Sequence, residues 1–205
     1  MKTKTTRPTS AAARRPQQVR IIGGAWKRTP LPVHDAEGLR PTPDRVRETL
    51  FNWLNFLWEL EWEHKRVLDL FAGSGALGFE AASRGAAQVV LCENQAAACR
   101  QLRANQEKLQ ATQIQILQGD AFLSSARLPG AFDLIFIDPP YQLALWPRAL
   151  ESASKLLAQD GLVYLELPKT QEIPPFLADW TIVRSMQAGM VACYLLCRNN
   201  CSRFA

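Results

Sequence analysis

The sequence predicts an α/β domain built on an open, mostly parallel sheet of seven strands that ends in an antiparallel hairpin. From residue 67 onward, short apolar runs alternate with segments of helical pattern, which is typical of parallel strands joined by crossover helices. The last two runs follow each other through Gln187, Ala188 and Gly189. That link is too short for a crossover, so these two strands should pair antiparallel.

Each element is assigned from its apolar pattern and its bounding turn residues. The expected strands cover residues 66–71, 88–93, 114–119, 132–138, 161–166, 181–186 and 191–197. The expected crossover helices cover residues 76–84, 95–109, 121–127 and 146–158. Upstream, residues 19–33 predict a small hairpin or irregular β unit with Gly23-Gly24 as the turn candidate. A further helix begins at Asp44, where apolar residues recur at spacings of three and four.

The charge of the 205-residue chain is concentrated at its N-terminal end. Residues 1–47 carry 11 Lys and Arg against 3 Asp and Glu, whereas the remainder carries 13 against 16, so the two parts have net charges of +8 and −3. Such asymmetry favours a polyanionic partner approached from the N-terminal side, although a solubilising tail has the same composition. The first 18 residues should form a disordered basic arm.

Several classes of protein are excluded by composition. No apolar run approaches the roughly 20 residues that span a bilayer, and the basic N-terminus lacks the apolar stretch of a secretory signal. The five cysteines are odd in number and unevenly spaced, and no two are separated by two residues. This pattern argues against a zinc site or a disulfide framework and fits a reducing cytosol. We therefore expect a soluble, cytoplasmic protein without a metal, and we further expect it to be a monomer.

The first candidate site is a glycine-rich segment after the first parallel strand. It reads Asp69-Leu70-Phe71-Ala72-Gly73-Ser74-Gly75-Ala76-Leu77-Gly78. The spacing of the three glycines is that of a nucleotide-binding loop, which by itself is a weak signal. A pyrophosphate site would have little negative charge nearby, so Asp69 favours instead a ligand with a cationic amino group.

Two more acids follow the next strands. Glu93 ends the second strand, where a carboxylate can accept hydrogen bonds from ribose hydroxyls, and Asp120 closes the third, where it can read an adenine edge while Ala121 or Phe122 packs on the ring. The alternatives are that Asp120 caps the following helix and that Glu93 is an exposed loop acid. The expected cofactor-binding residues are Asp69, Phe71, Ala72, Gly73, Ser74, Gly75, Glu93, Asn94, Asp120 and Ala121.

The catalytic candidate is Asp138-Pro139-Pro140-Tyr141, at the end of the fourth strand. Two successive prolines hold the chain rigid and leave its carbonyls free as acceptors. Asp138 and the carbonyl of Pro139 can accept the two hydrogens of an exocyclic base amine and aim its lone pair at a sulfonium methyl group. Tyr141 would then stack on a base that has left its helix. A generic alternative is a strand that ends in a proline turn with a surface tyrosine.

These motifs together resemble the class I, Rossmann-like, S-adenosylmethionine-dependent methyltransferases, whose amino-methyltransferase motif matches the tetrapeptide. Two upstream segments are similar, more narrowly, to the bacterial 16S ribosomal RNA guanine-N2 methyltransferases. They are Val19-Arg20-Ile21-Ile22-Gly23-Gly24 and Leu39-Arg40-Pro41-Thr42-Pro43-Asp44-Arg45-Val46-Arg47-Glu48-Thr49-Leu50-Phe51-Asn52-Trp53-Leu54. The similarity runs from about residue 19 to residue 198. Pro43 stands where many relatives carry a second Thr, and it fits a helix start.

The resemblance implies catalysis by Asp138, Pro139, Pro140 and Tyr141, with S-adenosylmethionine as cofactor. It implies methylation of the N2 amine of one guanine in 16S ribosomal RNA, within a small-subunit particle or an assembly intermediate. It also places several arginines near the entrance for cofactor and RNA, although a solvated helix face remains an alternative. The expected RNA-binding residues are Arg20, Trp26, Lys27, Arg28, Arg40, Arg45 and Arg47. The expected organisation is an RNA-facing extension over residues 19–60, a catalytic domain over 61–198 and a tail over 199–205.

Three other functions stay open at this point. The tetrapeptide also serves adenine N6 in DNA or other RNA, but the sequence has no evident target-recognition domain of a DNA enzyme. A non-catalytic RNA-binding assembly factor can share the fold, but it would not need an intact cofactor loop and Asp138. A nicotinamide-dependent oxidoreductase shares the glycine spacing, but it leaves the tetrapeptide unexplained.

Overall fold

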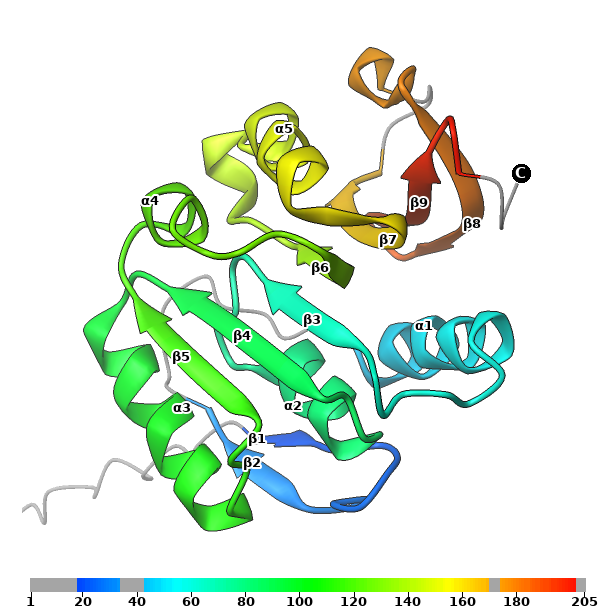
Figure 1. The fold of residues 1–205 in the computed structure, drawn as a ribbon. Helices are drawn as coiled ribbons and strands as arrows, with labels where there is room; N and C mark the ends of the chain where they lie inside the picture. The colour runs from blue at the N-terminus through cyan, green and yellow to red at the C-terminus, as the bar shows by residue number, and fades with distance from the viewer. Residues whose placement is uncertain (1–17, 34–42, 170–173, 202–205) are drawn as a thin grey trace, which may run out of the picture.

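The computed structural model describes residues 18–33, 43–169 and 174–201. The expectations for the basic arm, for Arg40 and for most of the C-terminal tail lie outside these residues. Within them the chain forms a seven-stranded sheet and a separate two-stranded sheet (Figure 1).

The seven-stranded sheet has the strand order β5-β4-β3-β6-β7-β9-β8. Its strands are β3 (Arg66–Asp69), β4 (Gln88–Glu93), β5 (Ile114–Gln118), β6 (Phe132–Ile137), β7 (Leu157–Pro168), β8 (Trp180–Ala188) and β9 (Val191–Arg198). Strands β3 to β7 pair in parallel, and β9 pairs antiparallel with both β7 and β8. The predicted mostly parallel sheet with an antiparallel hairpin at its end is therefore confirmed.

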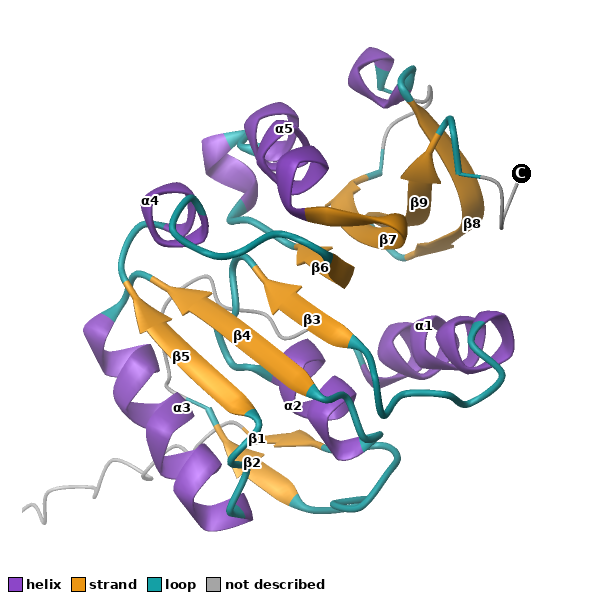
Figure 2. Ribbon diagram, viewed as in Figure 1, coloured by secondary structure: helices purple, strands orange, loops and turns teal. Residues whose placement is uncertain are grey.

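Helices cover both faces of this sheet (Figure 2). They are α1 (Asp44–Leu57), α2 (Ala76–Ser83), α3 (Ala96–Leu109), α4 (Ala121–Ser125) and α5 (Trp146–Leu156), with short 3₁₀ turns η1 (Tyr141–Leu143) and η2 (Pro175–Leu177). Because successive strand residues point to opposite faces, Val67 packs with α1, α2 and α3, whereas Leu68 packs with α4 and α5. Burial on both faces explains why the strands read as continuous apolar runs.

The join between α5 and β7 differs from the prediction. The helix ends at Leu156 rather than at residue 158, and the strand begins at Leu157 rather than at residue 161. Leu157 is buried and pairs with Phe132, while the next regular pair is Leu134 with Leu162. A bulge thus lies between the two pairs, and apolar periodicity alone does not reveal such an irregularity.

The N-terminal hairpin is formed by β1 (Gln18–Arg20) and β2 (Pro30–Pro32). The prediction that Gly23-Gly24 makes its turn is wrong, because the chain between the strands is a longer loop that docks on α2. The amide of Gly23 donates to Oε1 of Glu80 at 2.8 Å. Gly24 has φ +75°, and a Cβ there would lie 1.8 Å from the carbonyl oxygen of Ser83.

No helix in the three described segments is long and apolar enough to cross a membrane. All five cysteines are buried and free of disulfide bonds. Among the described residues, no cluster of three or more His, Cys, Asp or Glu side chains could hold a metal ion.

Replacing Gly24 with Ala should destabilise the chain, because a methyl group would collide with backbone at a left-handed residue. We expect the free energy of unfolding, measured by urea titration, to fall by about 2 kcal/mol or more. The matched control is Gly189→Ala, where φ is +60° and no atom lies within 4 Å of the added carbon. That control should cost only about 1 kcal/mol, and equal losses in the two variants would contradict the close-docking explanation.

Candidate active site

The sheet topology brings the carboxyl ends of β3 and β6 side by side at one edge. From β3 the chain proceeds through β4 to the edge strand β5 and then returns to place β6 on the other side of β3. The strand order therefore reverses between β3 and β6, which is where ligands bind in sheets of this type. Asp69 ends β3, Glu93 ends β4, and Asp138 directly follows β6. The arrows of β3, β4 and β5 point to this edge (Figure 1).

The glycine-rich segment is a tight loop held against β4. The amide of Gly73 donates to Oε2 of Glu93 at 2.8 Å, and the amide of Ala72 donates to the carbonyl of Cys92 at 2.9 Å. Gly75 precedes α2 with φ +77°, and a Cβ there would lie 2.6 Å from the side chains of Phe79 and Leu102. The loop thus needs glycine for both its conformation and its packing.

Glu93 is not an exposed loop acid, because its side chain is buried and holds the backbone. Its second carboxylate oxygen, Oε1, accepts from the amide of Gln95 at 2.7 Å. Two carboxylate oxygens offer about four acceptor positions, so two backbone contacts leave room for ligand hydroxyls. Asn94, which follows it, is exposed.

Asp69 carries the most perturbed carboxyl of the loop. Burial raises the pKa of Asp69 from its ordinary value of 3.8 to about 7; the amide of Phe71 opposes this rise, and the negative charge of Glu93 adds to it. A buried acid with a second acid nearby is stabilised in its charged form by a cation. The pair therefore fits a ligand that carries positive charge, as the amino and sulfonium groups of S-adenosylmethionine do.

Asp120 caps α4, as the alternative interpretation anticipated. Its Oδ1 accepts from the amides of Phe122 at 3.0 Å and Leu123 at 2.9 Å. The ring of Phe122 is largely buried, meets Phe71 edge-on with centroids 6.0 Å apart, and lies under the guanidinium of Arg148 at 3.9 Å. Phe122 and Ala121 are therefore both largely buried beside Asp120, and one face of the Phe122 ring is covered by Arg148.

The tetrapeptide turns away from β6 into η1. Pro139 is buried, Pro140 is exposed and Tyr141 is half-buried. The hydroxyl of Tyr141 donates to Oε1 of Glu166 on β7 at 2.8 Å. Burial raises the pKa of Tyr141, and the charges of Glu166 and Asp138 add to this rise. The Asp138 carboxylate therefore lies close enough to Tyr141 to influence the pKa of its hydroxyl.

Glu166 is the site residue that sequence reasoning missed. It lies within the apolar strand segment Leu162–Val163–Tyr164–Leu165–Glu166–Leu167 and is 5% exposed. An acid inside a buried strand must find hydrogen-bond donors. That rule would have marked Glu166 as an unusual position, but it does not say which donors the fold supplies.

Six of the seven predicted RNA-binding residues are described by the structure, and they differ in exposure. The exposed ones are Arg20, Lys27, Arg28 and Arg45, and Trp26 is partly buried against the core. Arg47 is a correction: it is fully buried, and its Nη2 donates to the carbonyl of Arg20 at 2.9 Å and to Oδ1 of Asp44 at 2.6 Å. A side chain enclosed in this way has no surface for a phosphate, so Arg47 instead ties α1 to the hairpin.

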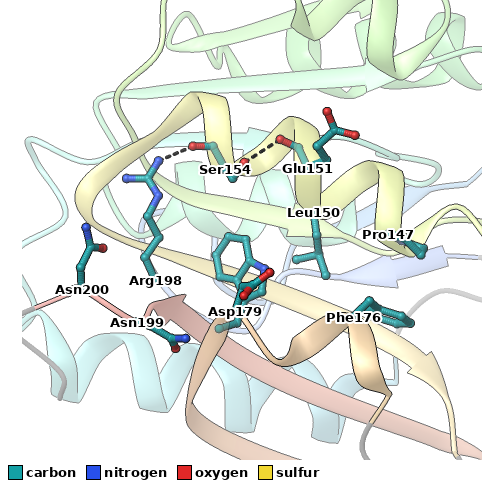
Figure 3. Close-up of a pocket in the computed structure, with 10 residues that line it drawn as sticks. Pro147, Leu150, Glu151, Ser154, Phe176, Asp179, Arg198, Asn199 and Asn200 are labelled. Atoms are coloured by element: carbon teal, nitrogen blue, oxygen red, sulfur yellow. Dashed lines mark hydrogen bonds between the residues drawn. The ribbon is translucent and has the colours of Figure 1, made fainter.

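A surface hollow of about 530 Å³ lies elsewhere, between α5, η2 and the ends of β8 and β9 (Figure 3). Arg198 lines it and pairs in register with Trp180, at the amino end of the parallel sheet. The guanidinium of Arg198 donates to the carbonyls of Ser154 and Leu157, so it satisfies the last turn of α5. This hollow shares none of the acids or glycines of the carboxyl edge.

The model of the family described as Conserved hypothetical protein 95 matches residues 19–197. The chain belongs to this family. Ribosomal RNA small subunit methyltransferase D of Escherichia coli K12 is 40% identical over 177 residues, covering 85% of this chain and 87% of the relative. The protein of the same name from Haemophilus influenzae is 37% identical over 191 residues, covering 89% and 94%.

The solved structure of yhhF from Escherichia coli, provisionally described as a methyltransferase, superposes with a TM-score of 0.79 at 36% identity. It covers 90% of this chain and 99% of its own. The predicted methyltransferase family and the Rossmann-like class I fold are therefore confirmed. S-adenosylmethionine is the cofactor of class I methyltransferases, as predicted.

The buried Asp69 should make stability depend on pH. Its folded pKa of about 7 exceeds its ordinary value of 3.8, so the folded chain holds the extra proton between these values. The stabilisation is complete below pH 3.8 and is lost as the pH rises to about 7. Relative to Asp69→Asn, the wild type should lose up to about 1.4 kcal/mol of unfolding free energy per pH unit in this window. Urea titrations from pH 5 to pH 8 measure this difference, and parallel pH curves for the two chains would contradict it.

Proposed function

We propose that the chain transfers a methyl group from S-adenosylmethionine to the exocyclic N2 amine of one guanine in 16S ribosomal RNA. The observation that carries this proposal is the position of Asp138-Pro139-Pro140-Tyr141 directly after β6, beside the glycine loop that follows β3. The names of the curated relatives, ribosomal RNA small subunit methyltransferase D, support the RNA and the subunit. The sequence similarity of the upstream segments supports guanine as the base.

The residues of two neighbouring strands divide the work. Asp69 at the end of β3 pairs in register with Phe136 of β6, so Asp138 stands two residues beyond that pair, on the adjacent strand. Asp69, Glu93 and the loop amides would hold the cofactor, which supplies an activated methyl group when bound. The tetrapeptide would hold the acceptor, so that donor and acceptor meet across a single strand spacing of about 5 Å.

Asp138 and the backbone carbonyl of Pro139 then orient the amine of the target base. Each accepts one hydrogen of the planar amine, which draws the nitrogen lone pair out of conjugation and toward the methyl group. The methyl donor is already activated, so a strong base is not needed before transfer. Asp138 or water takes the surplus proton afterward, and Tyr141 stacks on the base.

The N-terminal extension supplies the surface for the RNA backbone. Arg20, Lys27 and Arg28 are exposed on the hairpin, and Arg45 is exposed at the start of α1. Cations on one rigid unit gain affinity by displacing counterions from phosphates. We propose that the extension over residues 19–60 faces RNA within a small-subunit particle, with the chain acting as a cytoplasmic monomer.

The direct experiment incubates the purified chain with S-adenosylmethionine carrying a labelled methyl group and with small-subunit particles from a strain that lacks this enzyme. Mass spectrometry of the digested RNA should find the label on a single N2-methylguanosine. Label on the N6 amine of adenine would show that the target base is adenine and not guanine. Binding of NAD rather than S-adenosylmethionine, or no transfer at all, would overturn the proposal.

Asp138→Ala should abolish methyl transfer, because one of the two acceptors that orient the amine is gone. We expect turnover to fall by about a hundredfold or more, while calorimetry finds S-adenosylmethionine bound with nearly wild-type affinity. Asp133→Ala is a comparison on the same strand, since that carboxylate faces the amide of Arg66 at the other end of β6. Near-wild-type turnover in Asp138→Ala would refute the catalytic assignment.

Replacing Arg20, Arg28 and Arg40 with Ala should weaken RNA binding and flatten its dependence on salt. Each lost phosphate contact lowers the slope of log affinity against log salt by about 0.7 to 0.9, as measured by filter binding over a salt series. Arg184→Ala is the control, because Arg184 is exposed on β8 at the opposite edge of the sheet from β5. An unchanged slope in the triple variant would count against the extension as the RNA-binding surface.

A further inference from the structure

Glu166 lies beside the catalytic tetrapeptide on the neighbouring strand. Ile137 of β6 pairs in register with Leu165 of β7, so the next residues along, Asp138 and Glu166, stand level with each other. Glu166 is nevertheless 5% exposed. Burying a carboxylate is costly unless hydrogen bonds compensate it, so the bonds that it makes indicate what the position is for.

Both the side chain and the backbone of Glu166 accept hydrogen bonds from aromatic residues. Its Oε1 accepts from the hydroxyl of Tyr141 at 2.8 Å, and its Oε2 accepts from the hydroxyl of Tyr164 at 3.0 Å. Its backbone carbonyl accepts from the indole Nε1 of Trp146, the first residue of α5, at 2.9 Å. One residue thus fixes three aromatic side chains.

Two of these rings form a unit that borders the tetrapeptide. The ring centroids of Tyr141 and Trp146 lie 6.1 Å apart with an interplanar angle of 43°, and both residues are half-buried rather than enclosed. We refer to Tyr141 and Trp146 as the aromatic shelf. Tyr164, in contrast, lies within β7 with its side chain wholly buried in the core, so it has no face left for a ligand.

We propose that Glu166 is a positioning residue that fixes the aromatic shelf, so that an extruded RNA base stacks on Tyr141 and Trp146 with its amine at Asp138. This proposal rests on the proposed function and adds Trp146 to the surface that contacts RNA. Aromatic faces stack on any base, so the shelf would supply affinity and orientation while the acceptors of Asp138 and Pro139 select the amine.

A carboxylate suits this task because it only accepts hydrogen bonds. Two hydroxyl donors reach separate oxygens of Glu166, and each bond is strengthened by the negative charge. A glutamine at this position would turn one of the two acceptors into an NH₂ donor and would remove the charge. The bond to Tyr141 would then be at best a neutral one, so the ring would keep its hydrophobic contacts but lose the charge-assisted bond that sets its angle.

The test measures kcat and KM for RNA, together with S-adenosylmethionine affinity, in Glu166→Gln, Tyr141→Phe and the double variant. Loss of a hydrogen bond to a charged group should lower kcat/KM about ten- to a hundredfold in each single variant, with the cofactor dissociation constant unchanged. Because both changes remove the same charge-assisted bond, kcat/KM of the double variant should be no more than about threefold below that of the more impaired single variant.

Two further variants separate positioning from folding. Tyr164→Phe removes the other bond to the same carboxylate without touching the shelf, so it should lower the melting temperature more than it lowers kcat/KM. Trp146→Phe keeps an aromatic ring but removes the N–H that bonds to Glu166, and it should raise KM for RNA about three- to tenfold. Tyr141→Phe and Trp146→Phe change half-buried positions, so they carry the test even if Glu166→Gln fails to fold.

The proposal is overturned if Tyr141→Phe and Trp146→Phe keep wild-type kcat and KM. It is also overturned if the losses in Glu166→Gln and Tyr141→Phe multiply in the double variant, because independent losses mean that the hydroxyl does not act through the carboxylate. The wild-type chain is the control that separates this proposal from the proposed function. An inactive wild type refutes methyl transfer. An active wild type with unaffected variants refutes only the role of the aromatic shelf.

Discussion

The parallel pairing of β3 with β6 brings the two halves of the chemistry to one edge of the sheet. Only three register pairs make this contact, from Val67 with Leu134 to Asp69 with Phe136, and all of their side chains are buried. The glycine loop can follow β3, and the tetrapeptide can follow β6, only if those two strands end at the same level. A shift of one residue would turn every side chain to the other face and separate the two groups.

A second constraint links the glycine loop to the N-terminal hairpin, which we propose faces the RNA. Helix α2 begins after Gly75, at the end of the glycine loop, and ends at Ser83, which donates through Oγ to the carbonyl of Gly23. In between, the buried Glu80 accepts from the amides of Ile22 and Gly23. An eight-residue helix is about 12 Å long, so it sets the distance between the glycine loop and the hairpin that carries the proposed RNA-binding side chains. Such a rigid element would keep the target base in register with the methyl donor.

The sequence was sufficient for those parts of the structure that local patterns encode. Apolar runs predicted all seven strands, six of them within two residues of their observed bounds. The acids after the strands predicted one shared edge because parallel strands end together. The tetrapeptide could be placed for the same reason. Which cofactor atoms meet Asp69, Glu93 and Asp120 stays a prediction.

The features that sequence reasoning missed depend on contacts between distant residues. Arg47 looks like any exposed arginine in a helix, and only its contact with the carbonyl of Arg20, 27 residues earlier, shows that it is internal. Glu166 is a single acid in an apolar strand until Tyr141, 25 residues away, donates to it. The docking of Gly24 on Ser83 is equally invisible in the hairpin sequence. Such partners are chosen by tertiary packing, which no local periodicity records.

The most direct measurement is a crystal structure of the chain with bound S-adenosylhomocysteine. We expect the adenosyl group across the carboxyl ends of β3, β4 and β5, the ribose hydroxyls at Glu93, and the sulfur facing the Asp138 carboxylate. Density for the ligand in the hollow beside Arg198, or an Asp138 side chain that points away from the sulfur, would contradict it.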